Sequence, residues 1–149
     1  VQALRRAVAE GTIDVIGTDH APHTAEDKEC EWSCAAHGMT GLETALAVVQ
    51  STLVDTGLIG WERVAQIMSR TPARILGLTD QGQELAPGAT ANIVLWDPSG
   101  QTPVDPSTHA SKGRNSPYRG MTLPGGVRAT FYRGHPVVRD GEPATPLTR

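Results

Sequence analysis

The chain has 149 residues, of which 38% are hydrophobic, and a formal net charge of −3. This composition fits one folded domain or two pieces of a larger one, and the charge argues against a nucleic-acid-binding or membrane-seeking surface. No apolar run approaches the ~20 residues that span a bilayer, and no signal peptide opens the chain. Because the sequence starts within a helical pattern and lacks an initiator Met, we expect a fragment of a longer, cytoplasmic protein.

A helix is predicted at residues 1–10, where apolar residues recur at helical spacing and Gly11 provides a stop. The next run, residues 13–18, is rich in β-branched residues and predicts a buried parallel strand. The polar stretch Gly-Thr-Asp-His-Ala-Pro-His, residues 17–23, lies where this strand ends. Helix, strand, polar loop and helix in this order form the unit of a (β/α) barrel, whose strand ends carry the catalytic groups.

The connection at residues 24–37 is long and polar, which is typical of a lid or a binding segment. We expect Trp32 within it to anchor the loop against the barrel top, in preference to the alternative of stacking on a ligand. The two cysteines, Cys30 and Cys34, are predicted to be free thiols, because two thiols alone cannot complete a tetrahedral zinc site.

Two further helices are predicted. The first opens near Thr40, which has the capping-box spacing to Glu43, so Glu43 is assigned a structural and not a catalytic role. Its apolar stripe consists of Leu42, Ala45, Leu46, Val49 and Leu53. The second helix covers residues 61–70, and a short one follows with Thr71 as its N-cap and Gly77 as its stop.

After Leu78, glycine and proline separate short apolar runs, which is typical of an all-β unit. Strands are predicted at residues 91–97 and 127–133, and a hairpin at 134–139. The Gly-rich connection at 111–120 contains three basic residues and is interpreted as a solvated loop. The tail beyond Gly141 is expected to fray.

Several of these stretches resemble one family. Thr-Asp-His-Ala-Pro-His at 18–23 resembles the last metal-ligand motif of the dihydroorotases, in the amidohydrolase superfamily. Residues 71–78 are similar to the signature N-P-A-x-x-x-G-L that closes the barrel. Residues 88–94 are similar to G-x-x-A-D-[IVL]-[VL] of the flanking β-sandwich, with Asn92 where Asp is usual. Residues 111–120 are similar to S-x-x-x-N-[ST]-P-[FY]-x-G, the connector that packs sandwich to barrel.

The resemblance covers nearly the whole chain, which would itself form only the final third of such an enzyme. It implies an α/β fold: the last βα units of a (β/α)8 TIM barrel, with residues 1–78 as the C-terminal end of the metal-dependent barrel. Part of a small β-sandwich domain and the C-terminal tail would follow at residues 79–149.

A carboxylate and an imidazole at a strand end can serve a metal, a proton transfer or an anionic substrate. In the family, the residue matching Asp19 is both a zinc ligand and the general acid/base. The resemblance also implies that His23 contacts the substrate and that the backbone amides of His37 and Gly38 help to bind it. His20 is expected to have a structural or supporting role. The cofactor implied is a two-metal zinc centre, with its other ligands upstream of this chain.

The function implied is metal-dependent, reversible hydrolysis of the cyclic amide of L-dihydroorotate to N-carbamoyl-L-aspartate in pyrimidine biosynthesis. One alternative is a hydantoinase-like or allantoinase-like cyclic amidase, and another is a non-catalytic homologue with a scaffolding role. His23 favours the first hypothesis, since the related amidases resemble S/T-D-H-x-P followed by Phe, Trp or Cys and act on substrates without a ring carboxylate. The expected partner is a small molecule, not nucleic acid or membrane; a homo-oligomer and association with another pyrimidine-pathway enzyme both stay open.

Overall fold

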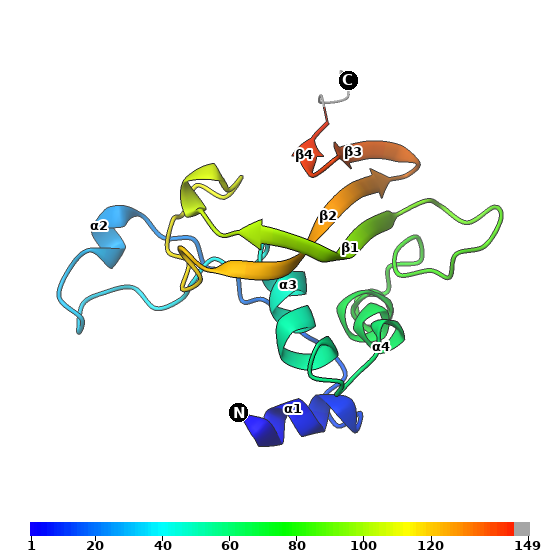
Figure 1. The fold of residues 1–149 in the computed structure, drawn as a ribbon, viewed down its shortest axis with the longest axis horizontal. Coiled ribbons are helices and arrows are strands. Elements are labelled where there is room, and N and C mark those ends of the chain that lie inside the picture. Colours follow the sequence, from blue (N-terminus) through cyan, green and yellow to red (C-terminus); the bar gives the residue numbers. More distant parts are fainter. Residues whose placement is uncertain (145–149) are drawn as a thin grey trace.

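The computed structural model describes residues 1–144, with helices in the first half of the chain and one antiparallel sheet in the second (Figure 1). The helices are α1 (Gln2–Ala9), α2 (Ala25–Lys28), α3 (Ala45–Val49), η1 (Gln50–Val54), α4 (Trp61–Ala65), η2 (Gln66–Arg70) and α5 (Thr71–Ile75). Of these, η1 and η2 are π-helical. The second half contains β1 (Ile93–Pro103), the 3₁₀-helix η3 (Pro106–Thr108), β2 (Thr122–Tyr132), β3 (His135–Arg139) and β4 (Glu142–Pro143).

The four strands form one sheet in the order β1-β2-β3-β4, and every neighbouring pair is antiparallel. The strands predicted at 91–97 and 127–133 and the hairpin that follows are confirmed, although β1 and β2 are both longer than expected. The predicted fraying is wrong for residues 142–143, which form β4; residues 145–149 lie outside the described part.

A side-chain pair joins β1 to β2. The Arg128 guanidinium donates to the Asp97 carboxylate, with its nearer nitrogen at 2.7 Å. Hydrogen bonds from Ser99 and then from Arg128 lower the pKa of Asp97 to about 2. The pair therefore stays charged at neutral pH.

The helices α3 and η1 cover one face of the sheet (Figure 1). A buried cluster joins the helical elements: Val8, Val49, Leu53, Ile59, Val64 and Ile67. A second cluster, made of Ala47, Val104 and Leu123, joins α3 to the sheet half. Gln50 is buried between the layers, where its side chain accepts from Trp96 Nε1 at 2.8 Å and donates to the Pro98 carbonyl at 2.9 Å.

The strand predicted at residues 13–18 is wrong for the part of the chain that the structure describes. The segment belongs to no strand, and its end is marked only by one parallel bridge between His20 and Met39. Ile13 and Ile16 are half-buried against the helical cluster, and the Ile16 amide donates to the Ile67 carbonyl at 3.1 Å. A strand requires a partner strand for its hydrogen-bond ladder, and none of the described strands lies beside this run.

The capping-box prediction is also wrong. The helix begins at Ala45, and the Glu43 carboxylate accepts hydrogen bonds from the amides of Ala110 and Ser111 at 3.1 and 3.2 Å. The Thr40 hydroxyl is buried without a hydrogen-bond partner in residues 1–144. Glu43 therefore holds a distant loop, which is still a structural role.

Two smaller expectations differ, and one is confirmed. Thr71 caps nothing, because α5 continues directly from η2 and the Thr71 side chain is buried. Trp32 is 95% exposed, so the part of the chain that the structure describes does not provide the packing predicted against the barrel top. Gly77 does end the last helix, with φ +67°. No helix within residues 1–144 has the length and apolar character needed to cross a bilayer.

Candidate functional site

The site predicted from the sequence lies where two segments run side by side. We call residues 17–23 the motif loop and residues 36–41 the facing segment. Besides the bridge between His20 and Met39, the Ala21 amide donates to the Met39 carbonyl at 2.9 Å. Gly41 permits this approach, because a Cβ atom there would lie 3.1 Å from the Thr18 carbonyl oxygen.

Asp19 occupies an unusual backbone position. Its φ of +45° is in the left-handed region, which non-glycine residues rarely adopt and which occurs preferentially at functional sites. The side chain is exposed, and its carboxylate makes no hydrogen bond with any residue in 1–144. The carboxylate is therefore free to accept an external ligand or a proton.

His20, the next residue, turns its ring toward the facing segment. Its Nδ1 accepts hydrogen bonds from the amides of Gly41 at 3.0 Å and Leu42 at 3.3 Å. An imidazole nitrogen that accepts carries no proton, so the neutral ring has its proton on Nε2. These contacts tie the motif loop to the residues just before α3.

His23 contacts the facing segment through its other ring nitrogen. Its Nε2 lies 2.8 Å from the His37 carbonyl oxygen, and since a carbonyl only accepts, Nε2 is the donor. The Nδ1 atom makes no hydrogen bond within the described residues. One ring nitrogen is thus used to orient the imidazole, and the other faces no protein partner there.

The amides of the facing segment are also available. Within residues 1–144, neither the His37 N–H nor the Gly38 N–H donates to a protein acceptor. The His37 carbonyl and the Gly38 N–H belong to one trans peptide and point in opposite directions. Because the carbonyl points at the His23 ring, the Gly38 amide points away from that ring.

Gly38 is required by this geometry. Its φ is +118°, and a Cβ atom there would lie 2.5 Å from the Ala21 Cβ and 3.4 Å from the His23 Nε2. The structure thus brings His23, His37 and Gly38 together. It forms no hydrogen bond from them to Asp19, which lies four residues before His23 in the same loop.

Two residues that hold these segments were missed by the sequence analysis. The Lys28 ammonium donates to the carbonyls of Ala36 at 2.7 Å and Gly38 at 3.2 Å. The Asn115 side chain reaches both segments from the connection at 111–120, which the sequence resemblance described only as packing. Neither contact has a local sequence signal, because one cation in a polar loop and one amide in a Gly-rich loop are common surface features.

The described residues do not complete a metal centre. Among them, no group of three or more His, Cys, Asp or Glu side chains could hold an ion. Asp19 fits the role of a single carboxylate ligand, because it is exposed and unpaired within residues 1–144. Cys30 and Cys34 are both free and exposed, as predicted.

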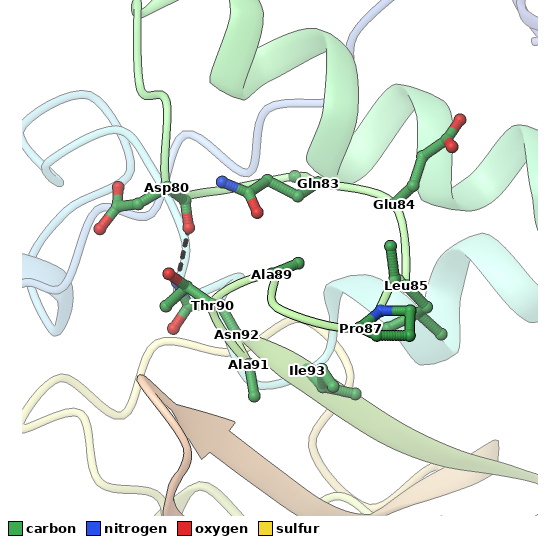
Figure 2. A pocket seen from close by; sticks show the side chains of 12 residues that line it. Asp80, Gln83, Glu84, Leu85, Pro87, Ala89, Thr90, Ala91, Asn92 and Ile93 are labelled. Carbon is green, nitrogen blue, oxygen red and sulfur yellow. Dashed lines mark hydrogen bonds between the residues drawn. The ribbon is translucent and has the colours of Figure 1, made fainter.

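A hollow of about 360 Å³ lies elsewhere, between the loop that follows α5 and the start of β1 (Figure 2). In Figure 1 this region and the segment around α2 are on opposite sides of the molecule. Asn92 borders it, donating to the Asp80 carbonyl at 2.6 Å and accepting from the Arg133 amide at 2.7 Å. An aspartate could not donate the first of these bonds, so the departure at Asn92 has a structural explanation.

Comparison with known proteins identifies the family to which the chain is similar. The model of the amidohydrolase family matches residues 1–137. The dihydroorotase of Leifsonia xyli is 52% identical over 141 residues, which are 95% of this chain and 32% of that protein. The dihydroorotase of Streptomyces coelicolor is 53% identical over 142 residues, 95% of this chain and 33% of that protein. This chain thus spans about a third of the length of these relatives.

Solved structures of hydantoinases also match this chain over about a third of their own length. L-hydantoinase (dihydropyrimidinase) from Arthrobacter aurescens is 34% identical, with a TM-score of 0.86 over 95% of this chain and 32% of its own. D-hydantoinase (dihydropyrimidinase) from a Thermus species is 26% identical, with a TM-score of 0.87 over 97% of this chain and 32% of its own. Since the family model matches most of its length, the chain belongs to the amidohydrolase family.

Proposed function

We propose that the chain is part of a dihydroorotase, which reversibly hydrolyses the cyclic amide of L-dihydroorotate to N-carbamoyl-L-aspartate in pyrimidine biosynthesis. The observation that carries this proposal is the gathering of the His23 ring and the free amides of His37 and Gly38 in the same loop pair as Asp19. Identity of about half to the dihydroorotases supports the same assignment.

Asp19 is the proposed general acid/base and a metal ligand. A free carboxylate at this position can orient a water molecule, accept its proton and pass the proton to the departing nitrogen. Zinc, when bound, supplies an activated water and polarises the substrate carbonyl. The remaining ligands of a two-metal zinc centre are proposed to come from outside this chain.

His23, His37 and Gly38 are the proposed substrate-binding residues. Dihydroorotate carries a carboxylate at the edge of its ring, which requires hydrogen-bond donors. The two free amides can donate directly. His23 can donate from Nδ1 when its ring is protonated, while Nε2 stays on the His37 carbonyl. Charge-assisted bonds of this kind are the strong ones.

For the whole protein, we propose a (β/α)8 TIM barrel, ended by residues 1–78, and a β-sandwich that includes residues 79–149. The proposed location is the cytoplasm, and the proposed partner is the small substrate. A homo-oligomer or association with another enzyme of the pathway is compatible with this arrangement.

A cyclic amidase of the hydantoinase type is the second candidate, because the solved neighbours carry that name. Its substrates lack the ring carboxylate, so they would leave the donors around His23 without a partner. The two candidates therefore differ in whether the donors at His23, His37 and Gly38 contribute to affinity.

The test is Asp19→Asn in the complete enzyme, assayed with dihydroorotate, hydantoin and allantoin. We expect turnover of dihydroorotate to fall by a factor of about 10² to 10⁴, as for loss of an acid/base. The matched control is Asp14→Asn, an exposed carboxylate of the same run that lies 3.7 Å from Arg63. Turnover near the parent level for Asp19→Asn would refute the assignment, and preference of the parent enzyme for hydantoin would favour the second candidate. A parent enzyme that hydrolyses none of the three would favour a scaffolding protein.

A further inference from the structure

The connection at residues 111–120, here called the connector, lies against both segments of the candidate site. Its centre is Asn115, whose side-chain oxygen accepts from the His23 amide at 3.2 Å. The side-chain nitrogen donates to the Ala21 carbonyl at 2.9 Å and to the Gly38 carbonyl at 3.3 Å. One amide side chain thus binds three backbone groups on two segments.

The connector is itself held in place at several points. The backbone carbonyl of Asn115 accepts from the Thr40 amide at 3.1 Å. Gly113 is buried against the motif loop, where a Cβ atom would lie 2.6 Å from the Pro22 Cβ. At its far end, the Gly120 amide donates to the Val104 carbonyl at 2.9 Å. These contacts therefore fix the position of the connector that carries Asn115.

We propose that Asn115 is a positioning residue for substrate binding, an inference that rests on the proposed function. It holds the His23 main chain and the Gly38 carbonyl at a fixed separation, and so sets the spacing between the motif loop, which carries the His23 ring, and the facing segment, which carries the amides of His37 and Gly38. Asn115 acts through these residues and does not itself touch the substrate.

The chemistry of the side chain explains why asparagine is suited to this position. The His23 amide requires an acceptor, whereas the carbonyls of Ala21 and Gly38 require a donor. Asparagine supplies both from one short planar group. Aspartate keeps the acceptor and loses the donor, and alanine loses both. At position 115, asparagine forms all three hydrogen bonds, aspartate keeps only the one from the His23 amide, and alanine keeps none.

The first measurement is hydrogen–deuterium exchange of the complete protein without substrate, for Asn115→Ala, Asn115→Asp and the control Ser116→Ala. The Ser116 hydroxyl accepts from the Tyr118 amide and, within residues 1–144, forms no hydrogen bond with either segment. We expect Asn115→Ala to raise exchange at the His23 amide and Asn115→Asp to raise it less. The Thr40 amide is bonded to the backbone of Asn115, so its unchanged protection reports that the connector is still docked.

The second measurement is the steady-state kinetics of dihydroorotate hydrolysis. We expect KM to rise about tenfold in Asn115→Ala, as for the loss of a hydrogen bond of ordinary strength, with a smaller change in kcat. We expect Asn115→Asp to recover part of the loss and Ser116→Ala to match the parent enzyme. A general loss of stability would not produce this split between KM and kcat.

The proposal is overturned if exchange at His23 is unchanged in Asn115→Ala, or if exchange rises while KM stays at the parent value. If Asn115→Ala does not fold, Asn115→Asp decides by the same two criteria. If the parent protein hydrolyses no cyclic amide, the proposed function fails and the exchange measurement alone decides whether Asn115 fixes the two segments.

Discussion

At the scale of single residues, the two nitrogens of the His23 ring have different environments. One donates to the His37 carbonyl, and the other has no partner within residues 1–144. We predict that His23→Ala in the complete enzyme weakens binding of dihydroorotate by about 1.5–3 kcal/mol, the value of a charge-assisted hydrogen bond. Metal content should not change, because His23 is assigned to the substrate.

This prediction is checked by metal analysis together with steady-state kinetics. His135→Ala is a suitable control, since His135 is exposed at the start of β3. Loss of zinc with unchanged substrate binding would mean that His23 is a metal ligand.

Part of the site could be predicted from local sequence and part could not. Asp19, His23 and Gly38 were identified from a short motif and its surroundings, and their roles stay predictions. Asn115 could not be assigned to the site, because it is 92 residues from His23 and nothing in its own segment specifies what it contacts. Glu43 shows the converse: its spacing to Thr40 is that of a capping box, but its carboxylate binds backbone amides 67 and 68 residues away.

At the scale of elements, the joint between η1 and the sheet depends on one buried amide. Gln50 is 3% exposed and binds both Trp96 Nε1 and the Pro98 carbonyl. We predict that Gln50→Leu lowers the free energy of unfolding by about 1–3 kcal/mol, because it leaves these two partners without hydrogen bonds.

Thermal or urea unfolding of the complete protein measures this effect. Ser51→Ala is the control, since within residues 1–144 the Ser51 hydroxyl donates only to the Val48 carbonyl in the preceding turn. Equal stability of Gln50→Leu and Ser51→Ala would show that the buried amide does not stabilise the joint.

The strands that follow Leu78 could be predicted because glycine and proline mark their turns, and hairpins pair neighbouring segments. The run at 13–18 was harder, since parallel pairing joins segments distant in sequence. Its apolar residues do pack, but against helices. Helix α3 begins later than predicted for a similar reason. Gly41 is bound to the motif loop and Thr40 to the connector, and these contacts keep both residues out of the helix.

At the scale of the whole molecule, the exposed apolar surface is distributed differently from the sequence expectation. Without the rest of a barrel, the sequence predicts that one apolar patch is exposed, made of Leu42, Leu46, Val49, Leu53, Ile13 and Ile16. Of these six residues, Val49 and Leu53 are buried, and only Leu42 is mostly exposed, at 63%. Other large apolar side chains are exposed instead, including Leu4, Ile75 and Leu76 at 64%, 66% and 71%. Exposed apolar surface of this kind often marks a contact face.

We predict that residues 1–149 expressed alone are inactive and either aggregate or become ordered only with the rest of the enzyme. The described part of the chain supplies no complete metal site, and its exposed apolar residues would lack a covering partner. Size-exclusion chromatography, thermal unfolding and a dihydroorotate assay with added zinc test this. A monomer with a cooperative unfolding transition, or zinc-dependent hydrolysis by the fragment, would contradict it.

The long reach of Asn115 has a consequence for the order in which the protein folds. The hydrogen bond to the His23 amide closes a loop of 92 residues, and contacts between distant segments form late because the entropy of loop closure opposes them. The buried helical cluster lies wholly within residues 8–67, but the motif loop and the facing segment acquire their final spacing only after the connector has docked. During synthesis, a nascent chain that has not yet emerged beyond residue 115 therefore has its proposed substrate-binding residues present but not yet arranged.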